Sequence, residues 1–167
     1  MAITEAMRTE ISELYVGLIG RAPDSDGLAF WVNGYNNRIE AGESDGDALR
    51  GIAQQMFDSE GARDYYPGFL TNQEIIENFC ENVLGRTGDQ AGIDFWTGKL
   101  NQEDKSAGDV LVSMVDAVKN YSGTDQAALD SQELFDNKSA VAEYYGTEVS
   151  EPGEVDIAQS TQLLDDV

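Results

Sequence analysis

Two short acidic segments hold the side chains best suited to bind a metal ion. In residues 24–27 aspartates alternate and a glycine follows, as at the start of a calcium-binding loop, and residues 43–47 form a second oxygen-rich cluster. Neither segment continues into the full loop pattern that ends in a bidentate glutamate. The sequence therefore predicts an incomplete calcium site, whose candidate ligands are Asp24, Asp26, Asp45 and Asp47.

The same type of residue also fits a purely structural role. Asp24, Asp47, Asp89 and Asp109 stand where helices are expected to begin. A carboxylate at a helix N-cap accepts a hydrogen bond from a free backbone N–H group and stabilises the first turn. We favour this capping interpretation over calcium binding and keep both open.

The sequence lacks the residues that most enzymes use for nucleophilic or zinc-dependent chemistry. It contains no histidine, which excludes Ser-His and Cys-His nucleophiles and the usual Cys/His zinc sites. Its single cysteine, Cys80, lies in the apolar run 75–83 and is expected to be a buried hydrophobic side chain. A hydrolase that uses two carboxylates stays formally open, but no pair stands out. We therefore predict that the protein is not an enzyme.

The chain is strongly acidic, with 32 Asp and Glu against 10 Lys and Arg and a formal net charge of -22. This charge repels phosphate backbones and anionic headgroups, and no apolar run is long enough to span a bilayer. We expect no nucleic-acid partner and no membrane insertion. The expected partners are cations, basic proteins, or anionic polymers reached through bridging calcium ions. Acidity that only keeps the chain soluble is the simpler alternative.

One stretch of the sequence is repeated. Residues 18–31 recur as 83–96, and both copies carry Gly-Arg, Asp, Gly and Phe-Trp at an offset of 65 residues. Residues 44–49 recur as 106–111 at an offset of 62 residues, which predicts a three-residue deletion in the loop between the two matching segments. Internal repetition of this kind is typical of a fold built from copies of one structural unit.

Helical periodicity runs through both copies, and no convincing strand pattern interrupts it. Copy one spans 5–66 and copy two 70–123, each with three helices, and a closing helix spans 125–145. A short further helix is expected to start near residue 155. We predict an all-α bundle of seven to eight helices in a domain 1–150, with 151–167 as a C-terminal extension or the start of a linker.

Two features of the repeat could bind ligands but fit structural roles better. Gly20-Arg21 and Gly85-Arg86 follow helix C-termini, where the negative partial charge repels anions. Their arginines are expected to bond the last carbonyls of their own helices or a nearby carboxylate. Trp31 and Trp96 could line a sugar site, but their helical spacing from neighbouring aliphatic residues predicts that both indoles lie in the core.

The N-terminal segment does not have the pattern of a secretory leader. Residues 1–21 are acidic and amphipathic, without the basic and then apolar segments of a cleavable signal peptide. We expect an export signal, if the protein leaves the cell, to lie elsewhere, for example at the C-terminus of a longer chain. A single cysteine fits cytosolic proteins and also proteins exported unfolded across both bacterial membranes.

The repeated motif resembles a known family. A bacterial helical domain of unknown function, found in S-layer and RTX-type secreted proteins, has a pattern similar to Leu18-x-Gly20-Arg21-x-Pro23-Asp24-x-x-Gly27-Leu28-x-x-Trp31 and its second copy. The segment that follows the second copy in that family is similar to residues 137–145. Copy two departs from the pattern at Thr87-Gly88, where proline is usual. A fainter likeness to the linker domains of cyanobacterial phycobilisomes lacks their basic character.

The resemblance implies type I secretion through an uncleaved C-terminal signal, and hence an extracellular or cell-surface location. In S-layer relatives the helical N-terminal region attaches the lattice to cell-surface polysaccharide. The resemblance thus implies a non-catalytic anchoring or interaction module that binds polysaccharide or lipopolysaccharide, with calcium as its cofactor, or other protein chains. The alternative is a structural spacer attached to a secreted adhesin or hydrolase.

Overall fold

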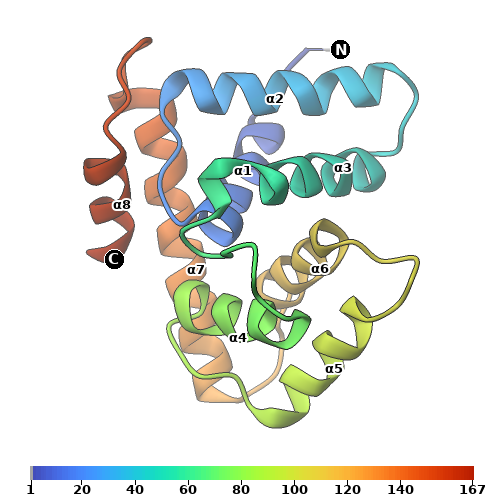
Figure 1. Ribbon diagram of the computed structural model, residues 1–167. Helices are drawn as coiled ribbons and strands as arrows, with labels where there is room; N and C mark the ends of the chain where they lie inside the picture. The colour runs from blue at the N-terminus through green and yellow to red at the C-terminus, as the bar shows by residue number, and fades with distance from the viewer. Residues whose placement is uncertain (1) are drawn as a thin grey trace.

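A computed structural model describes residues 2–167. Over these residues the chain forms eight α-helices and no strand, which confirms the predicted all-α bundle (Figure 1). The helices are α1 (Glu5–Leu14), α2 (Ser25–Glu40), α3 (Asp45–Asp58), α4 (Asn72–Val83), α5 (Gln90–Leu100), α6 (Ala107–Lys119), α7 (Gln126–Tyr144) and α8 (Ile157–Asp165). Three short turns, η1 (Tyr15–Ile19), η2 (Glu60–Ala62) and η3 (Tyr145–Val149), lie between them.

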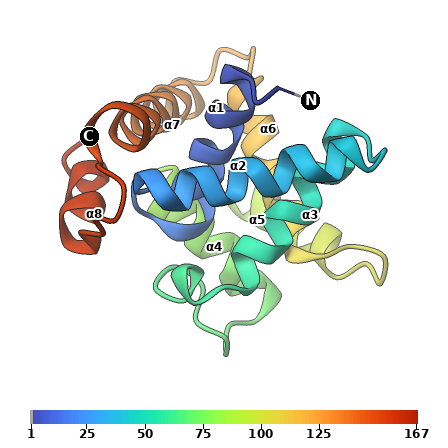
Figure 2. The same cartoon turned by 90° about the horizontal axis from the view of Figure 1, so that it is seen from above.

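The helices form two three-helix units in the same order along the chain. Copy one contributes α1 with η1, α2 and α3, and copy two contributes α4, α5 and α6. The largest contact between the units joins α3 to α6. The long helix α7 runs past both units, and α8 lies beside it at the edge of the molecule (Figures 1 and 2).

Glycine ends the first helix of each unit, as the sequence predicts. Gly20 and Gly85 both adopt positive φ angles, 74° and 67°, which residues with a side chain rarely adopt. The helix predicted over 5–19 is α1 followed without a break by η1, a π-helical turn. In this turn the carbonyl of Gly17 accepts a hydrogen bond of 2.7 Å from the buried hydroxyl of Tyr66.

The two units share one hydrophobic interior. Its fully buried side chains come from both copies and from α7 and α8, and the largest are Tyr35, Tyr66, Phe79, Phe135, Ile11, Leu14, Leu18, Ile52, Met56, Ile76, Leu111 and Leu164. The expectation that both tryptophans lie inside the core is only partly right. Trp31 and Trp96 are half-buried against the core, and each supports an exposed phenylalanine at a ring distance of 5.0 Å.

The three-residue difference between the copies does not lie in the loop where we predicted it. Helix α2 has 16 residues and its counterpart α5 has 11, while the following connection lengthens from 41–44 to 101–106. Copy two has therefore lost more than one turn at the end of its second helix. A deletion inside a helix and a longer loop give the same offset, so the sequence alone does not separate them.

Residues 151–167 pack against the rest of the fold. Helix α8 contacts α7, and its Leu164 is buried. The carbonyl of Ser160 accepts a hydrogen bond of 2.9 Å from the backbone N–H of Ala22, which links α8 to the connection between η1 and α2. Within the described chain, no helix is both long and apolar enough to cross a membrane.

Candidate ligand pocket

A pocket of about 520 Å³ opens in copy two, between α4, α5, α6 and the beginning of α7. Its walls are mainly apolar and include Phe79, Cys80, Leu84, Ile93, Trp96, Met114, Ala117, Val118, Ala127 and Ala128. Polar groups stand among them, from Arg86, Asp89, Tyr121, Asp125 and Ser131. An apolar pocket of this size with a few polar groups is the usual form of a small-ligand site. We refer to it below as the copy-two pocket.

The polar groups of the pocket are held in place by the backbone. Asp89 caps α5 and Asp125 caps α7, and in each case one carboxylate oxygen accepts a hydrogen bond from a backbone N–H, at 2.7 and 2.9 Å. The guanidinium of Arg86 donates through Nε to the hydroxyl of Ser131 at 3.0 Å. That hydroxyl in turn donates to the carbonyl of Leu84 at 3.1 Å. The aspartates and the arginine thus have fixed positions and unused hydrogen-bonding capacity.

In copy one the equivalent space is filled by the side chain of Tyr15. This residue is 2 % exposed, and the guanidinium of Arg21 lies 5.9 Å from the centre of its ring. Its hydroxyl reaches the start of α2, where a Cβ atom on Gly27 would lie only 2.5 Å away. Burial raises the pKa of Tyr15 to about 12, while the charge of Arg21 and, less strongly, a hydrogen bond with Trp31 act in the opposite direction. The nearby carboxylate of Asp24 also raises it.

The residue that takes the place of Tyr15 in copy two is Cys80. The residues around Tyr15 recur 65 positions later as Arg86, Asp89, Gly92 and Trp96, and all four line the copy-two pocket. The change from a tyrosine to a cysteine removes the ring and hydroxyl that close this space in copy one. Cys80 in place of Tyr15, together with Gly88 in place of Pro23 beside it, therefore opens this space in copy two.

Cys80 itself is a wall of the pocket rather than a reactive group. Its side chain is buried, and burial raises the pKa of the thiol, with a smaller opposing effect from Arg86. A raised pKa keeps the thiol protonated near neutral pH, where the protonated form is a poor nucleophile. The structure thus supports the sequence-based view of Cys80 as a small hydrophobic side chain.

The first pair of predicted calcium ligands lies at the beginning of α2. Asp24 is buried and caps the helix, with Oδ1 accepting from the N–H of Gly27 at 2.8 Å. Its Oδ2 lies 3.4 Å from Nη1 of Arg21. Asp26 accepts a hydrogen bond of 2.8 Å from the N–H of Gly153, which joins α2 to the connection before α8. Both carboxylates therefore have structural partners.

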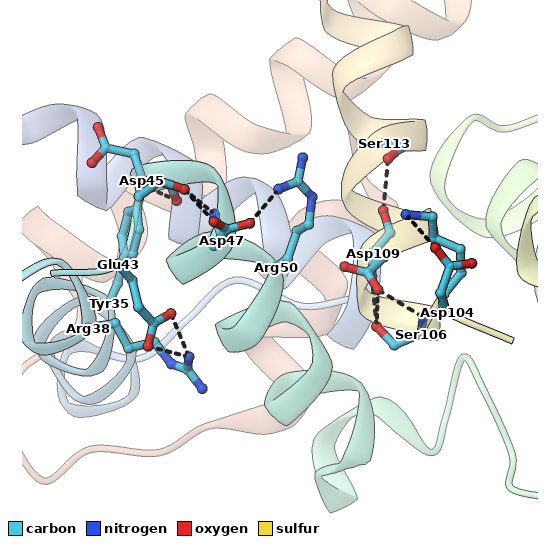
Figure 3. Close-up of polar contacts among 12 residues, drawn as sticks. Tyr35, Arg38, Glu43, Asp45, Asp47, Arg50, Asp104, Ser106, Asp109 and Ser113 are labelled. Atoms are coloured by element: carbon cyan, nitrogen blue, oxygen red, sulfur yellow. Dashed lines mark hydrogen bonds and ion pairs between the residues drawn. The ribbon is translucent and has the colours of Figure 1, made fainter. Parts of the chain in front are cut away.

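The second pair lies at the beginning of α3, at the other end of α2. Asp47 accepts from the hydroxyl of Ser44 at 2.7 Å and pairs with Arg50 at 3.2 Å. The carboxylate of Asp45 points away from that of Asp47, and its backbone carbonyl accepts a bond of 3.4 Å from the Tyr35 hydroxyl (Figure 3). Helix α2 is 16 residues long, about 24 Å, so the two pairs lie far apart.

No cluster of three or more carboxylate or thiol side chains able to hold a metal ion occurs between residues 2 and 167. Calcium prefers six or more oxygen ligands, so neither aspartate pair satisfies it without further oxygens from water or from a bound ligand. Calcium binding by Asp24, Asp26, Asp45 and Asp47 stays a prediction.

The capping interpretation is confirmed for two of its four aspartates. Asp24 and Asp89 are the N-caps of α2 and α5. It is wrong in detail for Asp47 and Asp109, because the caps of α3 and α6 are the serines three residues earlier, Ser44 and Ser106. A serine followed three residues later by an acidic residue is the capping-box pattern, which identifies the serine as the cap.

The two arginines of the repeat have different partners. Arg21 lies near a carboxylate, that of Asp24, as predicted. Arg86 instead donates to the hydroxyl of Ser131, and it forms no ion pair with any residue that the structure describes. The prediction is wrong for Arg86, because Ser131 lies on α7, outside the repeated sequence, and no spacing rule connects the two.

Sequence reasoning did not find the copy-two pocket. The signal was present, since aligning the two copies at an offset of 65 residues pairs Tyr15 with Cys80 while Arg86, Asp89, Gly92 and Trp96 repeat the residues that surround Tyr15. Wall residues from α6 and α7 carried no signal of their own, because their apolar spacing is also that of ordinary core residues.

Comparison with known proteins covers part of the chain. The model of a family described as a domain of unknown function, DUF4214, matches residues 53–122. This segment runs from the second half of α3 to just beyond α6, and it contains the residues of the copy-two pocket from Phe79 to Tyr121 but not those from Asp125 to Ser131. No curated protein and no solved structure matches the chain. The match supports a helical domain of unknown function, as the motif resemblance implies.

Proposed function

We propose that this chain is a non-catalytic attachment module of a secreted S-layer-like or RTX-like protein, which binds cell-surface polysaccharide outside the cell. The observation that carries the proposal is the copy-two pocket, open at Cys80 where copy one is closed by Tyr15. A repeat that keeps the arginine, the cap aspartate, the glycine and the tryptophan around a side chain but leaves its space empty has the form of a binding site derived from a structural one.

The chemistry of the pocket suits a sugar ring. A pyranose presents C–H groups on its flat faces and hydroxyl groups around its edge. The indole of Trp96 and the aliphatic walls offer apolar contact to the faces. Asp89 and Asp125 can accept hydrogen bonds from hydroxyl groups, and Arg86 can donate to them. A volume of about 520 Å³ leaves room for one sugar unit and part of the next.

The charges around the pocket favour a neutral sugar there. Asp89 and Asp125 oppose one arginine, Arg86, and the whole chain carries a formal charge of -22. An anion placed inside the pocket would meet two fixed carboxylates in a partly apolar surrounding, where their repulsion is weakly screened. Calcium is part of the same proposal, as an ion that joins surface carboxylates such as Asp45 to oxygens of the polysaccharide.

The decisive variant gives copy two the tyrosine that fills this space in copy one. Cys80→Tyr is expected to fill the pocket and to reduce binding of purified cell-surface polysaccharide and lipopolysaccharide by at least about tenfold, the loss that follows when about 1.4 kcal/mol of binding energy is removed. Calorimetric titration of the whole chain, with calcium and with a chelator, measures this effect. Cys80→Ser is the control, because it keeps the pocket open.

Two further measurements keep the test clear. Thermal melting checks that Cys80→Tyr is folded, and Trp96→Phe weakens the apolar contact without filling the pocket. If the unmodified chain binds no polysaccharide with or without calcium, the attachment function is rejected and the spacer alternative is favoured.

A further inference from the structure

A second cavity, of about 590 Å³, lies on the other side of Trp96 between α3, α5 and α6. Trp96 lines both this cavity and the copy-two pocket, so the two are neighbours across one indole. Three of the chain's ten basic residues line the second cavity, and they are Arg50, Lys99 and Lys105. Three aspartates, Asp47, Asp104 and Asp109, line it as well, so its walls carry as many carboxylates as cations. We call it the cationic groove, because its share of positive charge is high for a chain of charge -22.

Two of these cations have only loose partners. Arg50 pairs with Asp47 at 3.2 Å, and Lys105 pairs with Asp104 at 3.7 Å. All four side chains are exposed by more than two fifths of their surface, and such ion pairs contribute little because water competes for both charges. A ligand anion can therefore replace either carboxylate at little cost.

The third cation has no carboxylate partner in the described part of the chain. The ammonium group of Lys99 lies 5.4 Å from the centre of the Phe95 ring. Phe95 is 55 % exposed and meets Trp96 edge to face. Phe95 and Trp96, whose rings are nearly perpendicular, thus form an aromatic wall of the groove, and the Lys99 ammonium lies over the Phe95 ring.

One of the three carboxylates that line the groove, that of Asp109, is held by its own helix cap. Oδ2 of Asp109 accepts from both the N–H and the hydroxyl of Ser106, each at 2.9 Å. Figure 3 shows Arg50 and Asp47 on α3, opposite the start of α6, where Ser106 and Asp109 lie. The start of α6 also carries the positive end of the helix dipole. The groove therefore favours a negative group.

Copy one has no counterpart of this charge. The aromatic pair is kept as Phe30 and Trp31, but the positions of Lys99 and Lys105 are taken by Gly34 and Glu43. Copy one has a cavity of its own, of about 600 Å³ between α1, α2 and η3, but neither Phe30 nor Trp31 lines it. Among the described residues, the combination of an exposed aromatic pair with cations and a pocket that share one indole belongs to copy two.

We propose that the cationic groove binds an anionic sugar unit, with its ring on Phe95 and Trp96 and its negative group between Arg50, Lys99 and Lys105. The inference rests on the proposed function and deepens it. The ligand becomes an acidic polysaccharide that places a neutral unit in the copy-two pocket and a negatively charged neighbour in the groove. The recognised chemistry is an oxyanion on a sugar ring, carboxylate or phosphate.

The experiment compares one oligosaccharide with and without its charge. An oligosaccharide in which neutral N-acetylglucosamine alternates with glucuronate, and its methyl ester, which has the same backbone without the charges, are titrated against the whole chain by calorimetry in the presence of chelator. We expect the acid to bind about tenfold more tightly than the ester. The double variant Lys99→Gln with Lys105→Gln is expected to bind both equally, with its affinity for the ester unchanged.

The controls separate this inference from the proposed function. Arg8→Gln removes one positive charge on α1, outside the groove, and should keep the preference for the acid. Equal affinities for acid and ester in the unmodified chain would overturn the groove while leaving the neutral pocket intact. If the ester fails to bind but the acid binds through Lys99 and Lys105, the groove stands and the neutral pocket is rejected. If inorganic phosphate displaced the acidic oligosaccharide at a concentration similar to that of the oligosaccharide, the proposal that the groove recognises a sugar ring would be overturned.

Discussion

The two halves of this molecule have the same order of helices but differ in what lies between the first and second helix. In copy one Tyr15 fills that space, and η3 covers it from outside, with Gly146 against Pro23 and Leu28. In copy two Cys80 leaves the space open, and only the beginning of α7 closes one side. This difference fits a repeat in which one unit supplies stability and the other, as we propose, binds a ligand.

The same division appears in the polar contacts. In copy one the arginine and the N-cap aspartate, Arg21 and Asp24, lie within an ion-pair distance of 3.4 Å. In copy two Arg86 bonds to the hydroxyl of Ser131 instead, and the aspartate at the cap of α5 is exposed to solvent. Copy two therefore keeps charged groups at the pocket that copy one uses up internally.

The largest effect on stability is expected from reversing the exchange in copy one. Tyr15→Cys removes a fully packed aromatic side chain, and the cavity left behind should lower the free energy of unfolding by about 3 kcal/mol. Urea denaturation followed by circular dichroism measures the loss. Tyr15→Phe, which removes only the hydroxyl, should cost about 1 kcal/mol.

The matched change in copy two should have little effect on stability. Cys80→Ala removes one sulfur atom beside a space that is already open, so we expect a loss of about 1 kcal/mol or less. Equal losses for Tyr15→Cys and Cys80→Ala would contradict the division between a closed and an open half.

Much of the fold follows from the sequence. The buried stripe of the first helix, the stop at Gly20 and the cap at Asp24 are read directly from spacing and residue type, because they depend on residues close in sequence. The shortening of α5 cannot be predicted in this way, because the offset between two copies does not say where the residues are missing. The π-helical form of η1 also escapes such reasoning, and the hydrogen bond that its Gly17 carbonyl accepts comes from Tyr66, 49 positions away.

The candidate site was far less predictable than the fold. Aspartates with suitable spacing directed attention to calcium, but most of these side chains have nearby structural partners. The pocket depends on a missing side chain at Cys80 and on walls from α7, and absence leaves no pattern in a single copy. The cationic groove joins Arg50 on α3 to Lys99 on α5, and no local rule brings these together.

A smaller difference in stability is expected when alanine replaces either of two equivalent glycines, Gly46 at the start of α3 and Gly108 at the start of α6. A Cβ atom on Gly108 would lie 2.5 Å from the backbone nitrogen of Gln54, inside the contact between the two units. Gly108→Ala should therefore force α3 and α6 apart and cost about 2 kcal/mol. Its own N–H also donates to the side chain of Gln54 at 2.8 Å, a bond that the shift would weaken.

The equivalent change in copy one should have the opposite sign. A Cβ atom on Gly46 meets only the end of the flexible Arg50 side chain, at 3.3 Å. Because alanine favours a helix more than glycine does, Gly46→Ala should stabilise the chain by about 0.5 kcal/mol. Thermal melting of the two variants side by side gives the comparison, and a destabilised Gly46→Ala variant would show that α3 and α6 pack more symmetrically than the distances indicate.

The smallest expected effect concerns pH and a charge that only copy one buries. Glu13 of α1 is buried, while its counterpart in copy two is the neutral Asn78. Burial raises the pKa of Glu13, and the hydrogen bond of 2.7 Å from Lys119 only partly offsets this, with Glu10 and Asp136 adding repulsion. Because the folded-state pKa lies above the unfolded one, the protonated form favours folding. That contribution is complete below the unfolded pKa, near 4.5, and is lost as the pH rises through the folded-state pKa.

Glu13→Gln should remove this loss, since glutamine resembles the protonated side chain at every pH. The variant is then expected to gain stability relative to the unmodified chain at pH 7 and to show little difference at pH 4, as measured by urea denaturation at both values. Glu81→Gln, on the exposed face of α4, removes the same charge without changing a buried group. An equal gain for Glu81→Gln would mean that the relief of general repulsion in a chain of charge -22, and not the burial of Glu13, sets the pH dependence.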